Sequence, residues 1–182
     1  NDDALLREVF NILDEIRPNY GFADNHALFA QFGHSNRFDT ATVIFIKRVL
    51  QKGIPQAARK EILDRLFARF VSGDEAAFAR ELYMSTDQLR LMARTGMWIG
   101  SHGYDHSWMG ELPPAAQLAE TERSLEFLQH VGVPTREWVM CYPYGSYNQS
   151  LIDIVRAHGC RLGLTSKVGI AALDTTSAFT LE

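Results

Sequence analysis

The sequence predicts an α/β protein with a helical N-terminal half and parallel strands in its C-terminal half. Apolar residues recur at helical spacing through residues 1–84, whereas short apolar runs alternate with amphipathic helices in residues 85–182. Strands that alternate with helices are joined by right-handed crossovers and therefore run parallel. With 46% hydrophobic residues among 182, the chain can bury one sizeable core.

The first half is predicted to be a succession of helices. The first begins at Asp3, and Pro18 and Gly21 are expected to end it near Arg17. Further helices are expected over residues 24–32, 39–52, 55–72 and 74–82. The run over residues 43–46 also fits a strand, but the apolar stripe continues beyond it and favours a helix.

The second half is predicted to contain three parallel strands. A capping box at Ser85 opens a helix, and further helices are expected to begin near Pro114 and Asn148. The strands are expected over residues 97–101, 138–142 and 160–165. Because three strands make a poor parallel sheet, we expect another chain, or residues outside this sequence, to complete it.

Composition and charge exclude several classes of partner. The net charge of -4 argues against nucleic acid and anionic membrane surfaces, and no apolar run approaches the roughly 18 residues of a membrane span. Cys141 and Cys160 are too few for a disulfide scaffold. Nothing in the sequence separates a cytoplasmic location from one in the cell envelope.

Two groups of polar residues follow predicted strands. His102 and His106 come directly after the first, and Tyr142-Pro143-Tyr144-Gly145 follows the second. The carboxyl ends of parallel strands lie at one edge, where active sites of α/β proteins gather. Neutral imidazole is a common metal ligand, but a hydrolytic site needs three protein ligands, so a third, expected to be a carboxylate, must come from elsewhere.

The residues Ile99-Gly100-Ser101-His102-Gly103-Tyr104-Asp105-His106 and Tyr142-Pro143-Tyr144-Gly145 resemble the two motifs of the polysaccharide deacetylase family of carbohydrate esterases, in the right order. The resemblance implies a partial distorted (β/α) barrel with residues 1–84 as a helical insertion. It also implies removal of acetyl groups from N- or O-acetylated sugars or polysaccharide. It assigns His102 and His106 as ligands of a divalent metal, usually Zn²⁺, and the Tyr144 amide as an oxyanion donor.

Neighbouring residues receive accessory roles. Tyr142, Pro143 and Trp108 are expected to contact substrate, although Trp108 fits a core position equally well. Asp105 is a candidate to orient a ligand imidazole, and a solvated loop position suits it as well. Met97 and Trp98 are expected in the core. The alternatives to a metal site are that the two histidines follow the strand by chance and that Pro143-Tyr144-Gly145 forms an ordinary turn.

The chain departs from the family pattern in ways that matter for activity. It lacks the Thr-Phe-Asp-Asp-Gly motif that supplies the base and the third ligand, and Asp2-Asp3 is better explained as a helix cap. Cys141 stands where many members have arginine, and its strand position argues against a nucleophile. We therefore expect residues 1–182 alone to release little acetate, and we expect exposed edges of an incomplete barrel to favour oligomerisation.

The sequence is compatible with two other functions. One is a carbohydrate-binding or scaffold protein that has the deacetylase fold without catalysis. The other is an interaction module in which the helices of residues 1–84 contact a partner through an exposed apolar face.

Overall fold

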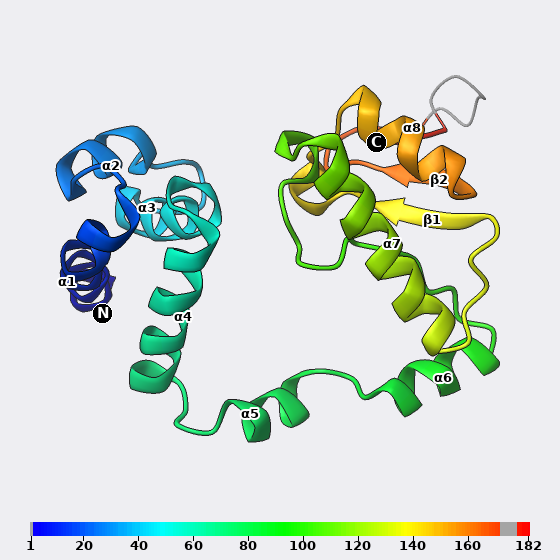
Figure 1. Ribbon diagram of the computed structural model, residues 1–182, viewed down its shortest axis with the longest axis horizontal. Helices are drawn as coiled ribbons and strands as arrows, with labels where there is room; N and C mark the ends of the chain where they lie inside the picture. Colours follow the sequence, from blue (N-terminus) through cyan, green and yellow to red (C-terminus); the bar gives the residue numbers. More distant parts are fainter. Residues whose placement is uncertain (1, 172–177) are drawn as a thin grey trace. The chain divides into compact units, whose positions relative to one another are not determined.

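The computed structural model describes residues 2–171 and 178–182, and the described chain forms two compact units, residues 1–83 and 84–182. Each unit has its own cluster of buried apolar side chains, and the two clusters share no residue. Figure 1 shows the helices of the first unit and the mixed helices and strands of the second. Among the described residues no helix is both long and apolar enough to cross a membrane.

All regular secondary structure in the described part of the first unit is helical. Its elements are α1 (Asp2–Tyr20), α2 (Asn25–Phe32), α3 (Ala41–Arg48), the π-helical η1 (Val49–Gly53), α4 (Gln56–Phe70) and α5 (Glu75–Leu82). Side chains of Asp24, Thr40 and Asp74 cap the starts of α2, α3 and α5. The predicted helices are confirmed, and the ambiguous run over residues 43–46 is helical.

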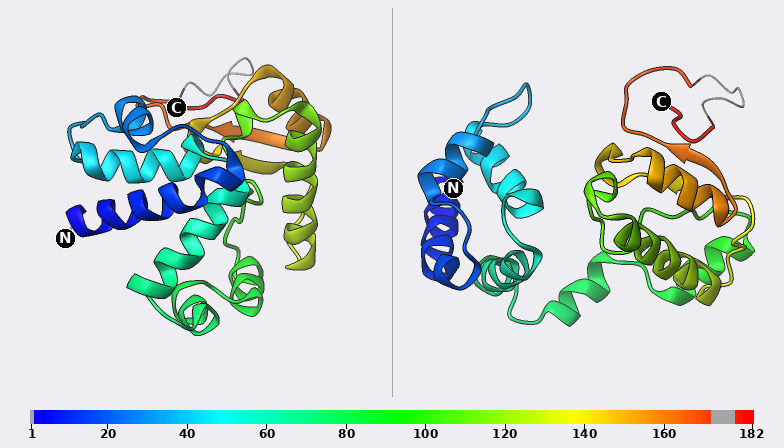
Figure 2. Two further views of the ribbon diagram at one scale, coloured as in Figure 1. Left: turned by 60° about the vertical axis from the view of Figure 1, so that its left-hand side comes forward. Right: turned by 45° about the horizontal axis from the view of Figure 1, so that its top comes forward.

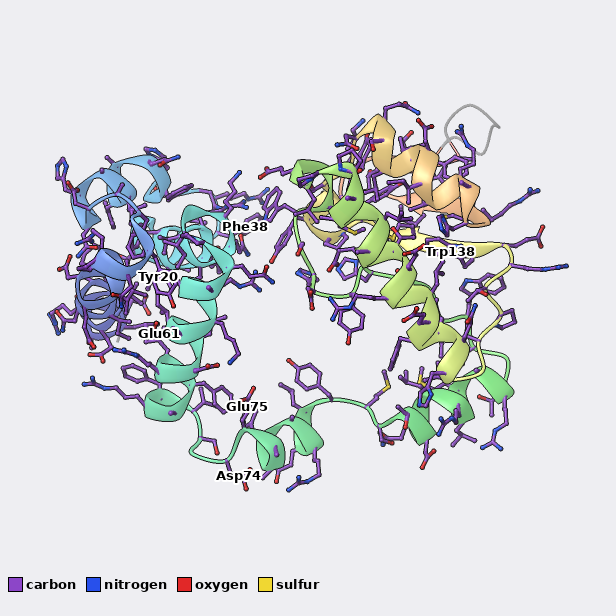
Figure 3. All side chains as sticks on the ribbon, viewed as in Figure 1. Tyr20, Phe38, Glu61, Asp74, Glu75 and Trp138 are labelled. Atoms are coloured by element: carbon purple, nitrogen blue, oxygen red, sulfur yellow. The ribbon has the colours of Figure 1, made fainter. Side chains whose placement is uncertain are left out.

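The core of this unit lies between α1, α3 and α4. Val9, Leu13, Phe45 and Ile62 are fully or almost fully buried there. Beside it, the Tyr20 hydroxyl lies 3.1 Å from a Glu61 carboxylate oxygen and joins the end of α1 to α4 (Figure 3). These helices are therefore stabilised mainly by burial of their apolar faces against one another, and less by the helix propensity of their residues.

One predicted boundary in this unit is wrong. Pro18 lies inside α1, and the helix continues to Tyr20. Pro18 cannot donate the backbone hydrogen bond of a regular helical residue, but only two residues of α1 follow it, so little of the helix depends on continuing past it. Gly21, the other residue predicted to end the helix, does end it, with a left-handed φ of 69° and its N–H bonded to the Arg17 carbonyl at 2.8 Å.

The second unit combines helices with a small parallel sheet. Its elements are α6 (Thr86–Arg94), η2 (Met109–Glu111), α7 (Pro114–His130), β1 (Trp138–Cys141), η3 (Pro143–Gly145), α8 (Gln149–Ala157) and β2 (Cys160–Leu164). The Ser85–Gln88 capping box opens α6 as expected. β1 and β2 pair in parallel, with Val139 opposite Leu162 and Cys141 opposite Leu164.

Each strand also has a single parallel bridge on its outer side. Ser101 bridges to Met140 of β1, and Leu181 bridges to Leu164 of β2. The parallel segments therefore follow the order of the sequence, with α7 and α8 as crossovers that contact each other (Figure 2). Crossovers of one hand between successive strands place both helices on the same face of the sheet.

The strand expected over residues 97–101 is reduced to that bridge. Met97 and Trp98 are 57% and 71% exposed, so the expectation that they belong to the core is also wrong. Met97 donates its N–H to the Met92 carbonyl of α6 at 3.0 Å, and the pairing with β1 begins only at Ser101, whose N–H donates to the Val139 carbonyl at 2.9 Å. The bridge at Leu181 lies in a segment that the sequence did not identify as a strand.

Candidate functional site

The histidine loop, residues 102–108, leaves the sheet at the carboxyl end of β1. Ser101 donates its N–H to Val139 and accepts the N–H of Cys141, both at 2.9 Å. This pairing fixes the residue before His102 against β1. The loop then returns at η2, whose Met109 side chain is fully buried in the core of the unit.

His102 is oriented by a backbone group of β1. Its Nδ1 lies 2.7 Å from the carbonyl oxygen of Cys141. A carbonyl oxygen can only accept, so Nδ1 carries the proton and donates, which leaves the Nε2 lone pair available. Metal-bound histidines are commonly held in this way, with one ring nitrogen donating to a carbonyl and the other facing the ion.

His106 lies beside His102, with ring centroids 4.7 Å apart and planes at 67°. Its backbone has φ of 53°, in the left-handed region that a non-glycine residue seldom adopts. Both histidines are exposed. The loop thus brings both imidazoles to one accessible place, as the sequence predicted.

Tyr144 reaches the same place from η3. Its ring lies 4.6 Å from that of His106, edge to face, and stacks on Trp108 at 4.5 Å with planes 8° apart. Tyr144 is also left-handed, with φ of 58° and ψ of 11°. Such conformations cost about 1–2 kcal/mol for a residue with a side chain, and they gather at functional sites.

The amide of Tyr144 is placed as a donor. Tyr144 is the second residue of a three-residue 3₁₀-helix, in which the hydrogen bonds run from Gly145 to Tyr142 and from Ser146 to Pro143. Amides in the first turn of a helix have no partner within it and can donate to a ligand. The predicted use of this amide therefore fits its backbone position.

The remaining predicted residues have other contacts. Tyr142 is 3% exposed and donates its hydroxyl to the Phe179 carbonyl at 3.1 Å, and Pro143 is also buried, so the structure gives both a packing role. Their contact with substrate stays a prediction. The Asp105 carboxylate pairs with Arg123 at 3.1 Å, while the Cys141 carbonyl orients the His102 ring.

The Cys141 side chain is half-buried, and burial raises the pKa of its thiol. A raised pKa keeps the thiol protonated near neutral pH, which removes the thiolate that a nucleophile needs. The geometry therefore uses the Cys141 carbonyl and not its sulfur.

The described residues contain no group of three or more His, Cys, Asp or Glu arranged to hold a metal ion. The histidine pair fits a metal in its chemistry, since His102 presents a free ring nitrogen next to a second imidazole. A hollow of about 400 Å³ adjoins His102 and is lined in part by Ile99, Tyr104 and Phe127. It offers room beside the pair.

Several contributors to the site were missed from the sequence. α7 carries buried polar side chains, Gln117, Glu120, Thr121 and Ser124, and two of them bond to the histidine loop or the residue before it. Their spacing puts them on one helix face, where apolar residues would be the norm. These polar residues at helical spacing were the signal in the sequence that could have identified this face of α7.

Comparison with known proteins connects these features to one family. Residues 53–163, more than half of the chain, match the family model described as polysaccharide deacetylase. The chain is 27% identical over 92 residues to YxkH of Bacillus subtilis (strain 168), named "putative polysaccharide deacetylase"; the match covers 50% of the chain and 33% of YxkH. The chain thus spans about a third of that relative.

Two solved structures are similar. The Streptococcus pyogenes deacetylase PplD in complex with acetate aligns with a TM-score of 0.50 and 18% identity, over 100% of the chain and 79% of PplD. A family 4 carbohydrate esterase from Streptomyces lividans, also in complex with acetate, aligns with a TM-score of 0.40 and 25% identity, over 43% and 40% of the two chains. At 18% identity, the likeness to PplD is one of fold alone.

Proposed function

The chain belongs to the polysaccharide deacetylase family, and from that premise we propose that it forms part of a metal-dependent hydrolase that removes acetyl groups from N- or O-acetylated sugars or polysaccharide. His102 and His106 are the metal ligands that this chain supplies. The parallel segments of residues 84–182 would be part of a distorted (β/α) barrel, and residues 1–83 an insertion in it.

The observation that carries this proposal is the orientation of His102. Its Nδ1–H donates to the Cys141 carbonyl at 2.7 Å, so the Nε2 of the neutral ring accepts a hydrogen bond or ligates a metal. His106 lies next to it at 4.7 Å between ring centroids. Two neighbouring imidazoles, at least one of which presents a free nitrogen at an exposed strand end, suit a Zn²⁺ ion better than a structural role.

When bound, a divalent cation such as Zn²⁺ lowers the pKa of water and polarises a carbonyl oxygen. The residues of this chain would bind the cation and orient the substrate beside it. The Tyr144 amide would donate to the oxygen of the acetyl group as negative charge develops on it, and removal of such a donor typically slows a reaction about 10²- to 10³-fold. Trp108, stacked on Tyr144, would border the sugar.

The described residues supply two imidazoles to this site without a third ligand beside them. Asp2 and Asp3 lie in the first turn of α1, in the other unit, where acidic side chains stabilise a helix start. We therefore propose that a carboxylate from outside the described residues completes the site. Because the sequence lacks the Thr-Phe-Asp-Asp-Gly motif of the family, we also propose that residues 1–182 alone turn over slowly. Lack of a general base commonly lowers a rate about 10²- to 10⁴-fold.

Metal binding provides the test. We expect the chain to bind Zn²⁺ in competition with a chromophoric chelator, and we expect His102→Ala and His106→Ala each to weaken binding about tenfold or more. His26→Ala, at an exposed position of α2, is the matched control and should bind as the unchanged chain does. Binding that survives loss of both histidines would refute the proposal.

A second function follows from the same incomplete ligand set. A protein with the deacetylase fold could bind acetylated carbohydrate without turnover. Acetate release from N-acetylated and O-acetylated oligosaccharides, measured with added Zn²⁺ and with a longer polypeptide that includes an aspartate pair, separates the two. Release by the longer polypeptide, abolished by His102→Ala, supports the hydrolase, whereas tight Zn²⁺ binding without release supports the binding protein.

A further inference from the structure

α7 directs a polar face at the histidine loop. Gln117, Glu120, Thr121 and Ser124 are all buried, with Glu120 only 6% exposed. Their spacing places them along one side of the helix. Burying a carboxylate is unfavourable unless hydrogen bonds compensate it, so the partners of Glu120 identify what it holds.

The Glu120 carboxylate binds the middle of the histidine loop. Its Oε2 accepts the backbone N–H groups of Tyr104 and Asp105, both at 3.0 Å. These amides belong to the bend between His102 and His106. Hydrogen bonds from amides to an ionised carboxylate are stronger than neutral ones, and two of them from consecutive residues fix the path of the backbone.

Neighbouring contacts fit a tightly seated bend. Gly103 has a left-handed φ of 73°, and a Cβ there would lie 3.4 Å from the Glu120 Oε2 and 3.2 Å from the Met109 sulfur. On the outer side, the Arg123 guanidinium lies over the Tyr104 ring at 3.7 Å and pairs with Asp105. At the start of the loop, the Ser124 hydroxyl lies 2.9 Å from that of Ser101.

We propose that Glu120 is a positioning residue that sets the spacing of the His102 and His106 imidazoles and thereby the affinity of the pair for a divalent cation. This inference rests on the proposed function. Glu120 acts through the backbone of the bend, since the Oε2 that faces the loop is taken by two amides. Without it, those amides lose their buried acceptor and the two histidines are no longer held in one geometry.

The test compares Glu120→Ala and Glu120→Gln with Glu126→Gln, which removes the same charge from an exposed position of α7. Measurements are Zn²⁺ affinity by chelator competition, the visible spectrum of the Co²⁺ complex, and amide hydrogen exchange at Tyr104 and Asp105. We expect Glu120→Ala to weaken Zn²⁺ binding about tenfold or more and to speed exchange at both amides. Glu120→Gln keeps an oxygen acceptor and should recover most of the affinity with an unchanged Co²⁺ spectrum.

Each other outcome overturns the inference. Equal affinity and exchange in Glu120→Ala and Glu126→Gln would show that the bend does not need Glu120. A Co²⁺ spectrum altered in Glu120→Gln, with affinity lost as in His102→Ala, would make Glu120 a ligand and not a positioning residue. If the unchanged chain binds no metal, the proposed function fails, but amide exchange still tests the role of Glu120 in the loop. Exchange at Tyr104 and Asp105 that is as slow in Glu120→Ala as in the unchanged chain refutes that role.

Discussion

At the scale of single residues, Tyr144 combines an unfavourable backbone conformation with favourable ring contacts. Its φ of 58° is left-handed, while its ring contacts both His106 and Trp108. Each aromatic pair contributes about 0.5–1.5 kcal/mol, which is enough to offset a backbone cost of about 1–2 kcal/mol. The contacts that hold the ring therefore also hold the amide in place.

Substitution by glycine and by alanine separates these contributions. Both Tyr144→Gly and Tyr144→Ala remove the ring, but only glycine adopts a left-handed φ without strain, so we expect Tyr144→Gly to be about 1 kcal/mol more stable in urea unfolding. At Ser146, whose φ is -86°, we expect the opposite order, with Ser146→Ala more stable in urea than Ser146→Gly. An alanine variant at residue 144 that is as stable as the glycine variant would contradict the left-handed assignment.

Cys160 gives a residue-level dependence on pH. Burial raises the pKa of its thiol to about 11, and its sulfur donates to the Leu162 carbonyl. In the unfolded chain a thiol ionises near pH 8.5, so between about pH 8.5 and 11 the unfolded state loses a proton that the folded state keeps. The free energy of unfolding should then fall as pH rises, and the full contribution is present below that range.

Urea unfolding between about pH 8 and 11 checks this. Cys160→Ala should show a shallower fall than the unchanged chain, and Cys141→Ala, at a half-buried position, should resemble the unchanged chain more closely. The pKa of Tyr142 is raised first by burial and then by the charge on Cys160; the burial part is common to all three proteins and cancels, whereas the part due to Cys160 is lost together with that thiol. Identical slopes for Cys160→Ala and the unchanged chain would refute the assignment.

At the scale of elements, residues 97–101 depend on a close approach to β1. A Cβ at Gly100 would lie 2.7 Å from the Val139 carbonyl oxygen, which is backbone and cannot easily move aside. We expect Gly100→Ala to lower the free energy of unfolding by about 1–3 kcal/mol and to weaken Zn²⁺ binding, because the next residues anchor His102. Gly73→Ala, where the space is open, is the control. Unchanged Zn²⁺ affinity in Gly100→Ala would separate the bridge from the site.

Most elements could be predicted from the sequence because their signals are local. The Ser85 capping box and the apolar stripe of α1 are properties of neighbouring residues. Pairing is not local: the run at residues 97–101 resembles a strand, yet it forms one bridge, and the bridge at Leu181 joins a segment too short to recognise. At the site, His102 and His106 could be named, but the Cys141 carbonyl that orients the His102 ring and the Glu120 carboxylate that binds the Tyr104 amide depend on the fold.

At the scale of the whole molecule, the chain has two separate cores. One contains Val9, Phe45 and Ile62, and the other contains Met140, Leu151 and Val155. A domain that owns its core can in principle fold alone. Loss of one core should therefore leave the other core intact, together with the proposed metal site in the second unit.

The tryptophans allow this independence to be measured. Trp98, Trp108 and Trp138 all lie in the second unit, so tryptophan fluorescence reports on that unit, whereas far-UV circular dichroism also follows the helices of the first. Phe45→Ala removes a fully buried ring and should destabilise the first unit by about 3–5 kcal/mol. We expect it to shift part of the circular dichroism transition to lower urea while the fluorescence transition and Zn²⁺ affinity stay unchanged.

Met140→Ala is the matched variant for the other core, because Met140 is also almost fully buried and its loss should destabilise by about 2–5 kcal/mol. It should shift the fluorescence transition and weaken Zn²⁺ binding, since Met140 lies opposite Ser101 next to the histidine loop. If Phe45→Ala moves both transitions together, the units unfold as one and the first unit supports the site. If only the circular dichroism responds, the site belongs to residues 84–182 by themselves.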